Sequence, residues 1–354
     1  MAKISFASFN LRNLQLPGKT YYASSKPYST GTYDAKIRWT ARMLQKLKAD
    51  VIGFQELWSP QALEEAFREA GLLDEFDIVA REAEVGKVQV GLAARKGMLR
   101  GEPAWMELPE ELHLVKRRKV GHEEGKNVYA DEVRVNFTQF SRPPLCVDIK
   151  PLSPKKAPQL KVIVAHLKSK RPTDIWREIR QHPEIKQHQE ALGSALSTIR
   201  RATEAAALRI HLNKMLKGTN KGVVVMGDLN DSSLSTTTTL LTEQPPYKLF
   251  EASRAGKTSD TGLYSAAMMQ QYRSLRDVYF THIYENQMES LDHILFSEQF
   301  YDHSDKRRWS FHEMKVYNDH LFEAHGAAKD EAPHMLPSDH GVVKVVFDHN
   351  PAKN

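Results

Sequence analysis

The chain has 354 residues, a net charge of +6 and one cysteine, Cys146. A single cysteine excludes an internal disulfide and a cysteine-rich zinc site, so oxygen or imidazole groups must hold any metal. The aliphatic runs are far shorter than the roughly 20 residues that a membrane-spanning helix needs, and the first residues do not resemble a secretory signal, although a processed start would look the same. We expect a cytoplasmic monomer without a membrane partner.

Short apolar runs typical of β-strands recur along the whole chain and alternate with helical patterns. The strand-like runs cover residues 4–9, 51–55, 76–80, 88–94, 133–140, 145–149, 160–167, 223–227, 291–296 and 342–347. Helical spacing marks residues 38–48 and 61–70, and the longest predicted helix covers about 185–217. This alternation indicates an α/β fold.

The longest predicted helix carries an apolar stripe that we expect to pack on a sheet. The stripe consists of Leu192, Leu196, Ile199, Ala202, Ala206 and Ile210. No internal repeat or linker divides the chain, which predicts one domain over residues 1–354. Four polar stretches interrupt the strand rhythm and are predicted to be inserted loops, near residues 17–34, 100–131, 168–183 and 301–337.

Polar residues of one chemical kind lie after predicted strands, within the strand-like run 291–296, or just before the last strand. They are Asn10, Glu56, His166, Asp228, Asn230, Asp292, Asp339 and His340. Each has a simple explanation alone, because an Asn or Asp after a strand is usually a turn or cap residue and a lone His on an apolar strand usually belongs to the core. Together they predict a shared site, since ligands collect at the carboxyl ends of strands. Carboxylate and amide oxygens favour Mg²⁺, with Mn²⁺ as the alternative.

Five short segments resemble, in order, the signatures of the endonuclease/exonuclease/phosphatase superfamily. They are Ser8-Phe9-Asn10-Leu11-Arg12, the run from Asp50 to Gln55-Glu56, Met226-Gly227-Asp228-Leu229-Asn230, Leu291-Asp292-His293 and Ser338-Asp339-His340. The resemblance covers nearly the whole chain. It departs from the usual Gly-Asp-Phe-Asn motif only in Leu229. The resemblance implies a deoxyribonuclease-I-like fold, a four-layered sandwich of two packed mixed β-sheets flanked by helices.

The resemblance also implies a role for each of these residues. Glu56 would be the main Mg²⁺ ligand, with Asn10 and Asp339 close to the ion. Asp228 would position or deprotonate the attacking water, and Asn230 would hold a phosphate oxygen. His340 would contact the scissile phosphate and would be oriented by Asp292. The implied chemistry is in-line attack of water on phosphorus without a covalent enzyme intermediate.

Two further matches favour the nuclease branch of this superfamily. Phe140-Ser141-Arg142-Pro143-Pro144 is similar to a segment of the pancreatic-type nucleases whose arginine approaches the target phosphate. His166 matches the histidine that those enzymes use near the leaving oxygen. The basic residues Lys168, Lys170 and Arg171, followed by Arg177 and Arg180, are predicted to contact the substrate. The tyrosines of residues 17–34 and the basic run 116–119 fit either a nucleic-acid groove or ordinary surface.

The leading hypothesis is a Mg²⁺-dependent nuclease that cuts DNA with little sequence preference. One alternative is a phosphoesterase that acts on a lipid or inositol phosphate, although no long insertion is clearly apolar. Another is a noncatalytic nucleic-acid-binding module, which the retained polar residues argue against. The sequence does not distinguish DNA from RNA, single from double strands, endo from exo cutting, or a preference for abasic sites.

Overall fold

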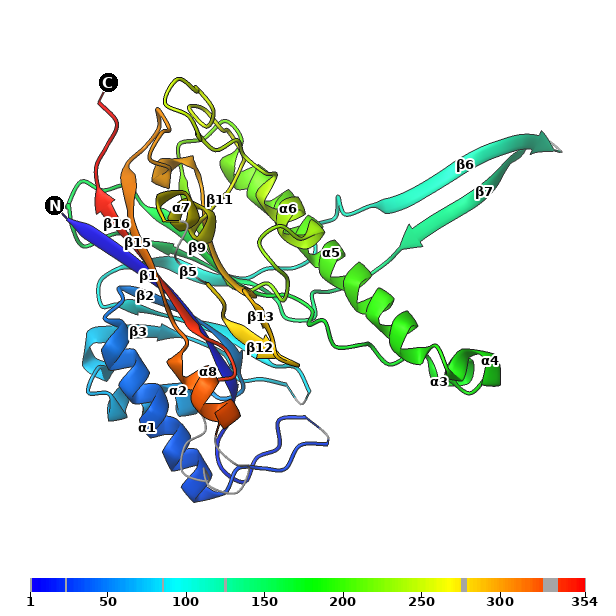
Figure 1. Ribbon diagram of the computed structural model, residues 1–354, viewed down its shortest axis with the longest axis horizontal. Helices are drawn as coiled ribbons and strands as arrows, with labels where there is room; N and C mark the ends of the chain where they lie inside the picture. Colours follow the sequence, from blue (N-terminus) through cyan, green and yellow to red (C-terminus); the bar gives the residue numbers. More distant parts are fainter. Residues whose placement is uncertain are drawn as a thin grey trace.

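Two six-stranded mixed β-sheets lie face to face at the centre of the protein, seen in a computed structural model that describes residues 2–22, 24–84, 86–123, 126–274, 279–326 and 337–353 (Figure 1). The first sheet has the order β15 (Trp309–Tyr317), β16 (Val342–His349), β1 (Lys3–Leu14), β2 (Val51–Leu57), β4 (Gln89–Arg95) and β3 (Phe76–Val79). The second has the order β11 (Tyr264–Ser265), β14 (Asp292–Phe296), β10 (Gly222–Asp228), β9 (Leu160–His166), β8 (Leu145–Ile149) and β5 (Leu99–Trp105).

Helices cover the outer face of each sheet, so the protein has four layers. The longer helices are α1 (Thr30–Leu47) and α2 (Pro60–Glu69) on the first sheet, and α5 (Gln189–Leu216) with α6 (Thr236–Thr242) on the second. The shorter ones are η1 (Leu73–Glu75), α3 (Arg177–Arg180), α4 (Pro183–Lys186), α7 (Ala266–Arg273), η2 (Glu298–Phe300) and α8 (Asp319–Gly326). The predicted fold class is confirmed.

The largest hydrophobic cluster lies between the two sheets, where the inner faces of their strands interdigitate. The two sheets approach each other closely at Gly53 of β2. A Cβ atom at this position would lie 2.9 Å from a methyl group of Val164 on β9 and 3.1 Å from Met226 on β10. A glycine in the middle of β2 therefore lets the two sheets approach, and it brings the end of β2 toward the ends of β9 and β10.

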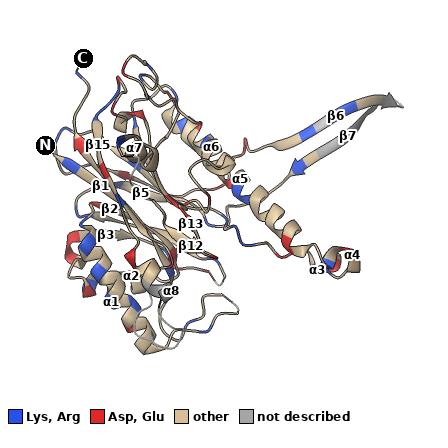
Figure 2. Cartoon of the chain, viewed as in Figure 1, with Lys and Arg blue, Asp and Glu red and all other residues tan. Residues whose placement is uncertain are grey.

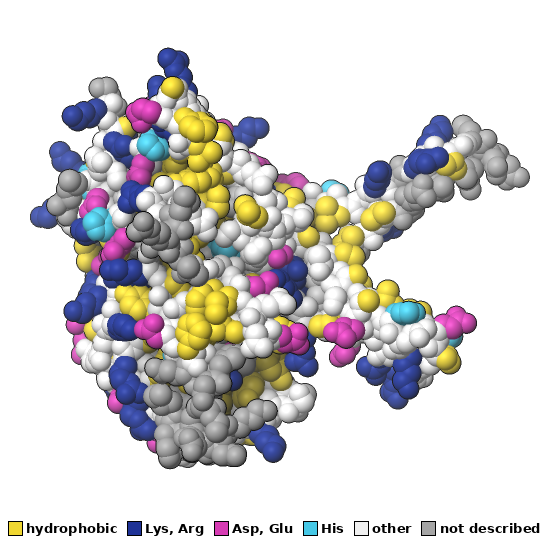
Figure 3. Space-filling model, viewed as in Figure 1, with side chains coloured by type: hydrophobic (Ala, Val, Ile, Leu, Met, Phe, Trp, Pro, Cys, Tyr) yellow, Lys and Arg dark blue, Asp and Glu magenta, His cyan; other side chains and the backbone are white. Residues whose placement is uncertain are grey.

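Two elements project from the sandwich. The first is the hairpin of β6 (Leu114–Glu123) and β7 (Lys126–Val135), which belongs to neither main sheet. The second, which we call the arm, comprises α3, α4 and the first part of α5 (Figure 1). Lys and Arg lie on both projections (Figure 2), and the surface between them is hollowed (Figure 3). None of the described helices is long and apolar enough to span a membrane.

Regular structure occupies much of two of the four stretches predicted as inserted loops, 100–131 and 301–337, and the prediction is corrected there. Residues 301–337 contain β15 and α8, with 327–336 outside the described residues. Residues 100–131 contain most of β5 and of the hairpin, with 124–125 outside the described part. In residues 17–34, α1 already begins at Thr30, where the hydroxyl of Ser29 accepts a hydrogen bond from the amide of Thr32 at 3.2 Å. Residues 168–183 are mostly irregular and include α3.

Two further local predictions were wrong. The strand expected over 133–140 ends at Val135 and is part of the hairpin. The stripe predicted to be the buried face of the long helix is turned away from the sheet at its start, since Leu192, Leu196 and Ile199 are exposed. The buried face of α5 instead includes polar residues: Ser197, Arg201, Glu204 and Arg209. These side chains bind neighbouring loops, and that requirement overrides the hydrophobic pattern. The smaller strand pair β12 (His282–Tyr284) and β13 (Gln287–Glu289) was not predicted.

Candidate active site

Three of the predicted residues lie side by side on adjacent strands of the second sheet. Asp228 at the end of β10 is opposite His166 of β9 on one side and opposite Asp292 of β14 on the other. The preceding Gly227 has a φ of 150°, and a Cβ atom there would clash with the backbone carbonyl of Ala165. Glycine is therefore required before Asp228, because only a residue without a side chain lets β10 lie this close to β9.

His340 and Asp292 form a buried hydrogen-bonded pair beside Asp228. The Nδ1 atom of His340 is 2.7 Å from Oδ2 of Asp292, and its Nε2 atom is 3.9 Å from Oδ2 of Asp228. Burial alone would lower the pKa of His340, but the carboxylates of Asp292 and Asp228 raise it well above its usual range. His340 is therefore a cation at neutral pH, with Nε2 directed toward the site and Nδ1 fixed by Asp292.

Asp228 lies at the centre of the cluster. Its Oδ2 atom accepts a hydrogen bond from Nδ2 of Asn10 at 3.2 Å and is 3.4 Å from Nε2 of His166. Burial raises the pKa of Asp228 to about 7, and the negative charge of Asp292 adds to this effect, while the cation of His340 opposes it. Burial and the charge of Arg142 lower the pKa of His166, so this imidazole is neutral. A carboxylate with a pKa near neutrality suits proton transfer.

Glu56 is the last but one residue of β2 on the opposite sheet and faces the same space. It has a φ of 56°, its Oε2 atom accepts a hydrogen bond from the amide of Asn13 at 3.0 Å, and Nδ2 of Asn10 is 3.5 Å from Oε1. Burial and the nearby charge of Asp339 raise the pKa of Glu56. Asp339 itself has a side chain that is 48% exposed and lies 3.7 Å from Nε of Arg12.

The donor set around Glu56 fits a hard divalent cation better than the cluster around His340 does. Asp228, Asp292 and His340 offer ligand atoms within 4.8 Å of one another. A protonated imidazole cannot coordinate a metal, however, and Nδ1 of His340 is already engaged by Asp292. Glu56 and Asp339 are two anionic groups that repel each other, and a cation between them would relieve that repulsion. Asn10 donates its amide protons to the carboxylates, and its oxygen accepts from the amide of Arg12.

The strand ends that carry His166, Asp228 and Glu56, together with Asp292 and His340, are called the edge below. Arg142 reaches this edge through the loop between the hairpin and β8. Its Nη1 atom donates to the carbonyl of Leu167 at 3.0 Å, directly after His166. The side-chain amide of Asn230 donates to the same carbonyl, also at 3.0 Å. Asn230 has a φ of 54°, and its backbone amide donates to Oδ1 of Asp228 at 2.8 Å. The carbonyl of Leu167 therefore holds Arg142 and Asn230 next to His166 and Asp228.

The three basic residues after His166 are not equivalent. Lys168 is half-buried, and its amine donates to the carbonyl of Arg171 at 3.1 Å, within its own loop. Lys170 forms an ion pair of 2.7 Å with Glu289 of β13. Arg171 is exposed. Lys170 and Arg171 are thus both exposed, and Lys168 is bound within its own loop.

Several residues near the site were given no individual role from the sequence, although Tyr22 and Ser338 belong to segments singled out there. Tyr22 packs edge-on against Trp58, with ring centroids 5.0 Å apart, and its pKa is raised by burial and by the charge of Glu56. The ring of His282 lies 4.9 Å from that of His340. Ser338 donates to the carbonyl of Asn10 at 2.7 Å and joins the last motif to the first. Tyr22 belongs to the tyrosine-rich loop, which was a detectable signal, whereas His282 lies in a short segment without one.

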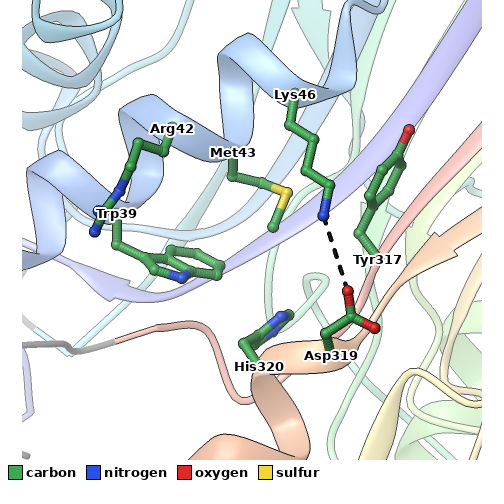
Figure 4. A pocket seen from close by; sticks show the side chains of 7 residues that line it. All are labelled: Trp39, Arg42, Met43, Lys46, Tyr317, Asp319 and His320. Carbon is green, nitrogen blue, oxygen red and sulfur yellow. Dashed lines mark ion pairs between the residues drawn. The ribbon is translucent and has the colours of Figure 1, made fainter.

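Two cavities outside this edge are not lined by any predicted site residue. One, of about 260 Å³, lies between α1 and the start of α8 and is drawn in Figure 4. In its lining, Lys46 pairs with Asp319 at 3.9 Å, and the ring of His320 lies edge-on to Trp39. The imidazole of His320 donates to the carbonyl of His340 at 2.9 Å. The other, of about 300 Å³, is lined by residues of α1 and α2. The hydrogen bond from His320, which lines the first cavity, holds the backbone of His340.

Comparisons with known proteins show the family and the fold of the chain. A model of the Endonuclease/Exonuclease/phosphatase family matches residues 137–340. Among solved structures, an endonuclease/exonuclease/phosphatase from Bacteroides vulgatus is similar, with a TM-score of 0.53 and 13% identity over 99% of this chain and 100% of that one.

Two other similar structures differ in what they act on or bind. D. rerio TDP2, complexed with a single strand DNA product, has a TM-score of 0.52 and 12% identity over 98% of this chain and 100% of that one. The mannosyl-6-phosphatase Bt3783 of Bacteroides thetaiotaomicron has a TM-score of 0.52 and 15% identity over 98% and 99%. At such identities the similarity shows the fold alone. No curated protein matches the chain in sequence.

Proposed function

Because the chain belongs to the Endonuclease/Exonuclease/phosphatase family, a superfamily of metal-dependent phosphodiesterases and phosphatases, we propose that it is a Mg²⁺-dependent phosphodiester hydrolase that cuts DNA with little sequence preference. The observation that carries the proposal is the row of His166, Asp228 and Asp292 across adjacent strands, closed by the His340 cation. This row combines a proton acceptor and a fixed cation within 4 Å, as hydrolysis of a phosphodiester requires.

Each group has a distinct task in the proposed reaction. Asp228 orients the attacking water and accepts its proton, since burial holds its pKa near 7. The Nε2 atom of His340 donates a hydrogen bond to a phosphate oxygen where negative charge develops, and Asp292 keeps the imidazole in that orientation. Neutral His166 lies on the other side of Asp228 and is placed to assist the leaving oxygen.

Glu56 and Asp339 would hold Mg²⁺, which supplies Lewis-acid stabilisation of the phosphate charge. Asn10 would act by fixing the carboxylate of Glu56, because its amide protons point at both Glu56 and Asp228. Arg142 and Asn230, which share the carbonyl of Leu167, would hold the phosphate oxygens. In these assignments Glu56 and Asp339 hold the metal, and Arg142 and Asn230 hold the phosphate.

The choice of nucleic acid as the substrate is supported by the two projections. Lys116 and Lys119 on the hairpin and Arg171 and Arg177 near the arm are exposed. They extend the positive charge beyond the scissile phosphate, which a long polyanion can use and a small phosphorylated sugar cannot.

A Mg²⁺-dependent cleavage panel tests the proposal. Its substrates are supercoiled plasmid, linear duplex, single-stranded DNA, RNA, an abasic duplex and a phosphomonoester, each with and without a chelator. Chelator-sensitive nicking of the plasmid is the expected result, and an Asp228→Asn preparation is the matched control for contaminating nuclease. Turnover of the phosphomonoester without cleavage of any polynucleotide would replace the nuclease with a phosphatase. Binding of DNA without any turnover would favour the noncatalytic module.

A further inference from the structure

Glu204 on α5 is a buried carboxylate outside every motif of the proposed site. Its side chain is 2% exposed, although it belongs to a helix on the outer face of the second sheet. Its Oε1 atom accepts hydrogen bonds from the backbone amide of Ser141 at 2.8 Å and from Nε of Arg200 at 2.9 Å. Its Oε2 atom accepts one from the backbone amide of Lys168 at 2.9 Å. One carboxylate thus binds two separate chain segments.

These two segments carry the residues that would grip the phosphate. Ser141 directly precedes Arg142, and Lys168 is two residues beyond His166. The guanidinium of Arg142 also donates to the carbonyl of Leu167 at 3.0 Å, so the segments are joined at two neighbouring points. Glu204 holds their backbones, and the Leu167 contact sets the direction of the arginine side chain.

The residues next to Glu204 on α5 complete this attachment. Arg201 donates to the carbonyl of Lys168 at 3.3 Å, so the helix binds both the N–H and the C=O of that residue. Arg201 also contacts Oδ2 of Asp231 at 3.1 Å, next to Asn230. Arg200 donates to the carbonyl of Gln139 and lies over the ring of Phe137, 4.2 Å from its centroid. The base of the hairpin and the loop after β9 therefore share one helix as their support.

We propose that Glu204 is a positioning residue that fixes Arg142 relative to His166 for phosphate binding. The inference rests on the proposed function, because it assigns Arg142 to the substrate. A carboxylate suits this task because two backbone N–H groups require two acceptor atoms. A glutamine supplies only one acceptor, and its amide group would face the other N–H.

The first test compares Glu204→Gln with wild-type protein in kcat and KM on a short DNA substrate. We expect kcat/KM to fall by about tenfold to hundredfold, since small displacements of positioned groups have effects of this size. Glu243→Gln is the matched control, because Glu243 lies 3.6 Å from Nε of Arg209 on the same helix, away from the site. The control should keep wild-type kcat/KM. Equal losses in both variants would overturn the inference.

A double-mutant cycle with Arg142→Ala separates positioning from general structural support. If Glu204 acts through Arg142, most of the effect of Glu204→Gln disappears when Arg142 is already alanine. A full, additive loss in the Arg142→Ala background would show that Glu204 does not act through the arginine and would overturn the inference. Thermal unfolding of all variants gives the stability change separately.

Two additions keep the test decisive. If Glu204→Gln does not fold, Glu204→Asp replaces it. Aspartate keeps the negative charge, but its side chain is too short to reach both backbone amides. Unchanged kcat/KM in Glu204→Asp would contradict the proposal. The same cycle is also measured as the affinity for inorganic phosphate in the presence of Mg²⁺, which needs no turnover. A wild-type protein without hydrolytic activity would refute the proposed function, while the phosphate cycle would still decide the role of Glu204.

Discussion

The charged groups of the edge are buried, whereas the charged groups of the two projections are exposed to solvent. At the edge, Asp228, Asp292 and His340 are buried, and His340 lies within hydrogen-bond or ion-pair distance of both carboxylates. On the hairpin, on the arm and in the loop that leads to the arm, the cations Lys116, Lys119, Arg177 and Arg171 are exposed. Buried charges interact strongly and at fixed geometry, whereas exposed charges are screened by salt. We therefore expect chemistry to depend on the edge, and capture of a long substrate to depend on the projections.

The largest expected effect is the loss of catalysis when the edge loses a reacting group. Asp228→Asn removes the proton acceptor and His340→Ala removes the fixed cation, so each should lower kcat by about 10²–10⁴-fold. Steady-state kinetics on a short substrate measure this change, and circular dichroism shows whether the fold is retained. A folded variant with near-normal turnover would remove that residue from the mechanism.

The second prediction concerns pH. Asp228 must be ionised to accept a proton, and burial raises its pKa to about 7. As the pH falls below this value, the ionised fraction decreases, so kcat/KM should drop by about tenfold per pH unit. Capture of DNA by the projections does not require ionised Asp228, so DNA binding should change little. The measurement is kcat/KM and DNA affinity from pH 5 to pH 8 on one preparation. Parallel losses of both quantities would contradict the prediction.

The sequence predicted that residues at the ends of buried strands converge, and the structure brings Asn10, Glu56, His166 and Asp228 together, while their roles stay predictions. Apolar runs that end in Asn10, Glu56, His166 or Asp228 place these side chains at strand ends, and adjacent strands bring the ends together. The order of the motifs then implied the fold. Nothing in this reasoning required knowledge of loops.

The face of α5 could not be predicted in the same way. Hydrophobic periodicity assumes that polar side chains face water, but Ser197, Arg201 and Glu204 face inward because they bind the loop after β9. Their partners are backbone groups of residues about 30 positions earlier in the chain, and a pattern within the helix does not report on them. β15 was missed for a local reason, since a register shift between Phe311 and Glu313 interrupts the alternation of the strand.

A smaller effect is expected when the edge loses a proposed metal ligand. Glu56→Gln removes one anionic oxygen, so the Mg²⁺ concentration for half-maximal activity should rise by at least about tenfold, the size seen even for indirect partners of metal sites. Saturating Mg²⁺ should restore part of the activity by mass action. Metal titration measures the change. An unaltered half-saturating concentration would show that Glu56 is not a ligand, and Glu204→Gln should leave it unaltered.

The smallest effect, and the sharpest test of the comparison, comes from the projections. Replacing Lys116, Lys119, Arg171 and Arg177 with alanine should weaken binding of long DNA and flatten its salt dependence by about one unit of slope for each phosphate that is no longer neutralised. Cleavage of a dinucleotide should stay unchanged, because a substrate this short does not reach either projection. Lys170→Ala is the matched control, since Lys170 already pairs with Glu289 at 2.7 Å and should contribute little to the slope. An unchanged slope in the fourfold variant would make these cations ordinary surface and favour a small phosphorylated substrate. Slower cleavage of the dinucleotide as well would mean that the projections support the edge itself, and the separation between chemistry and capture would fail.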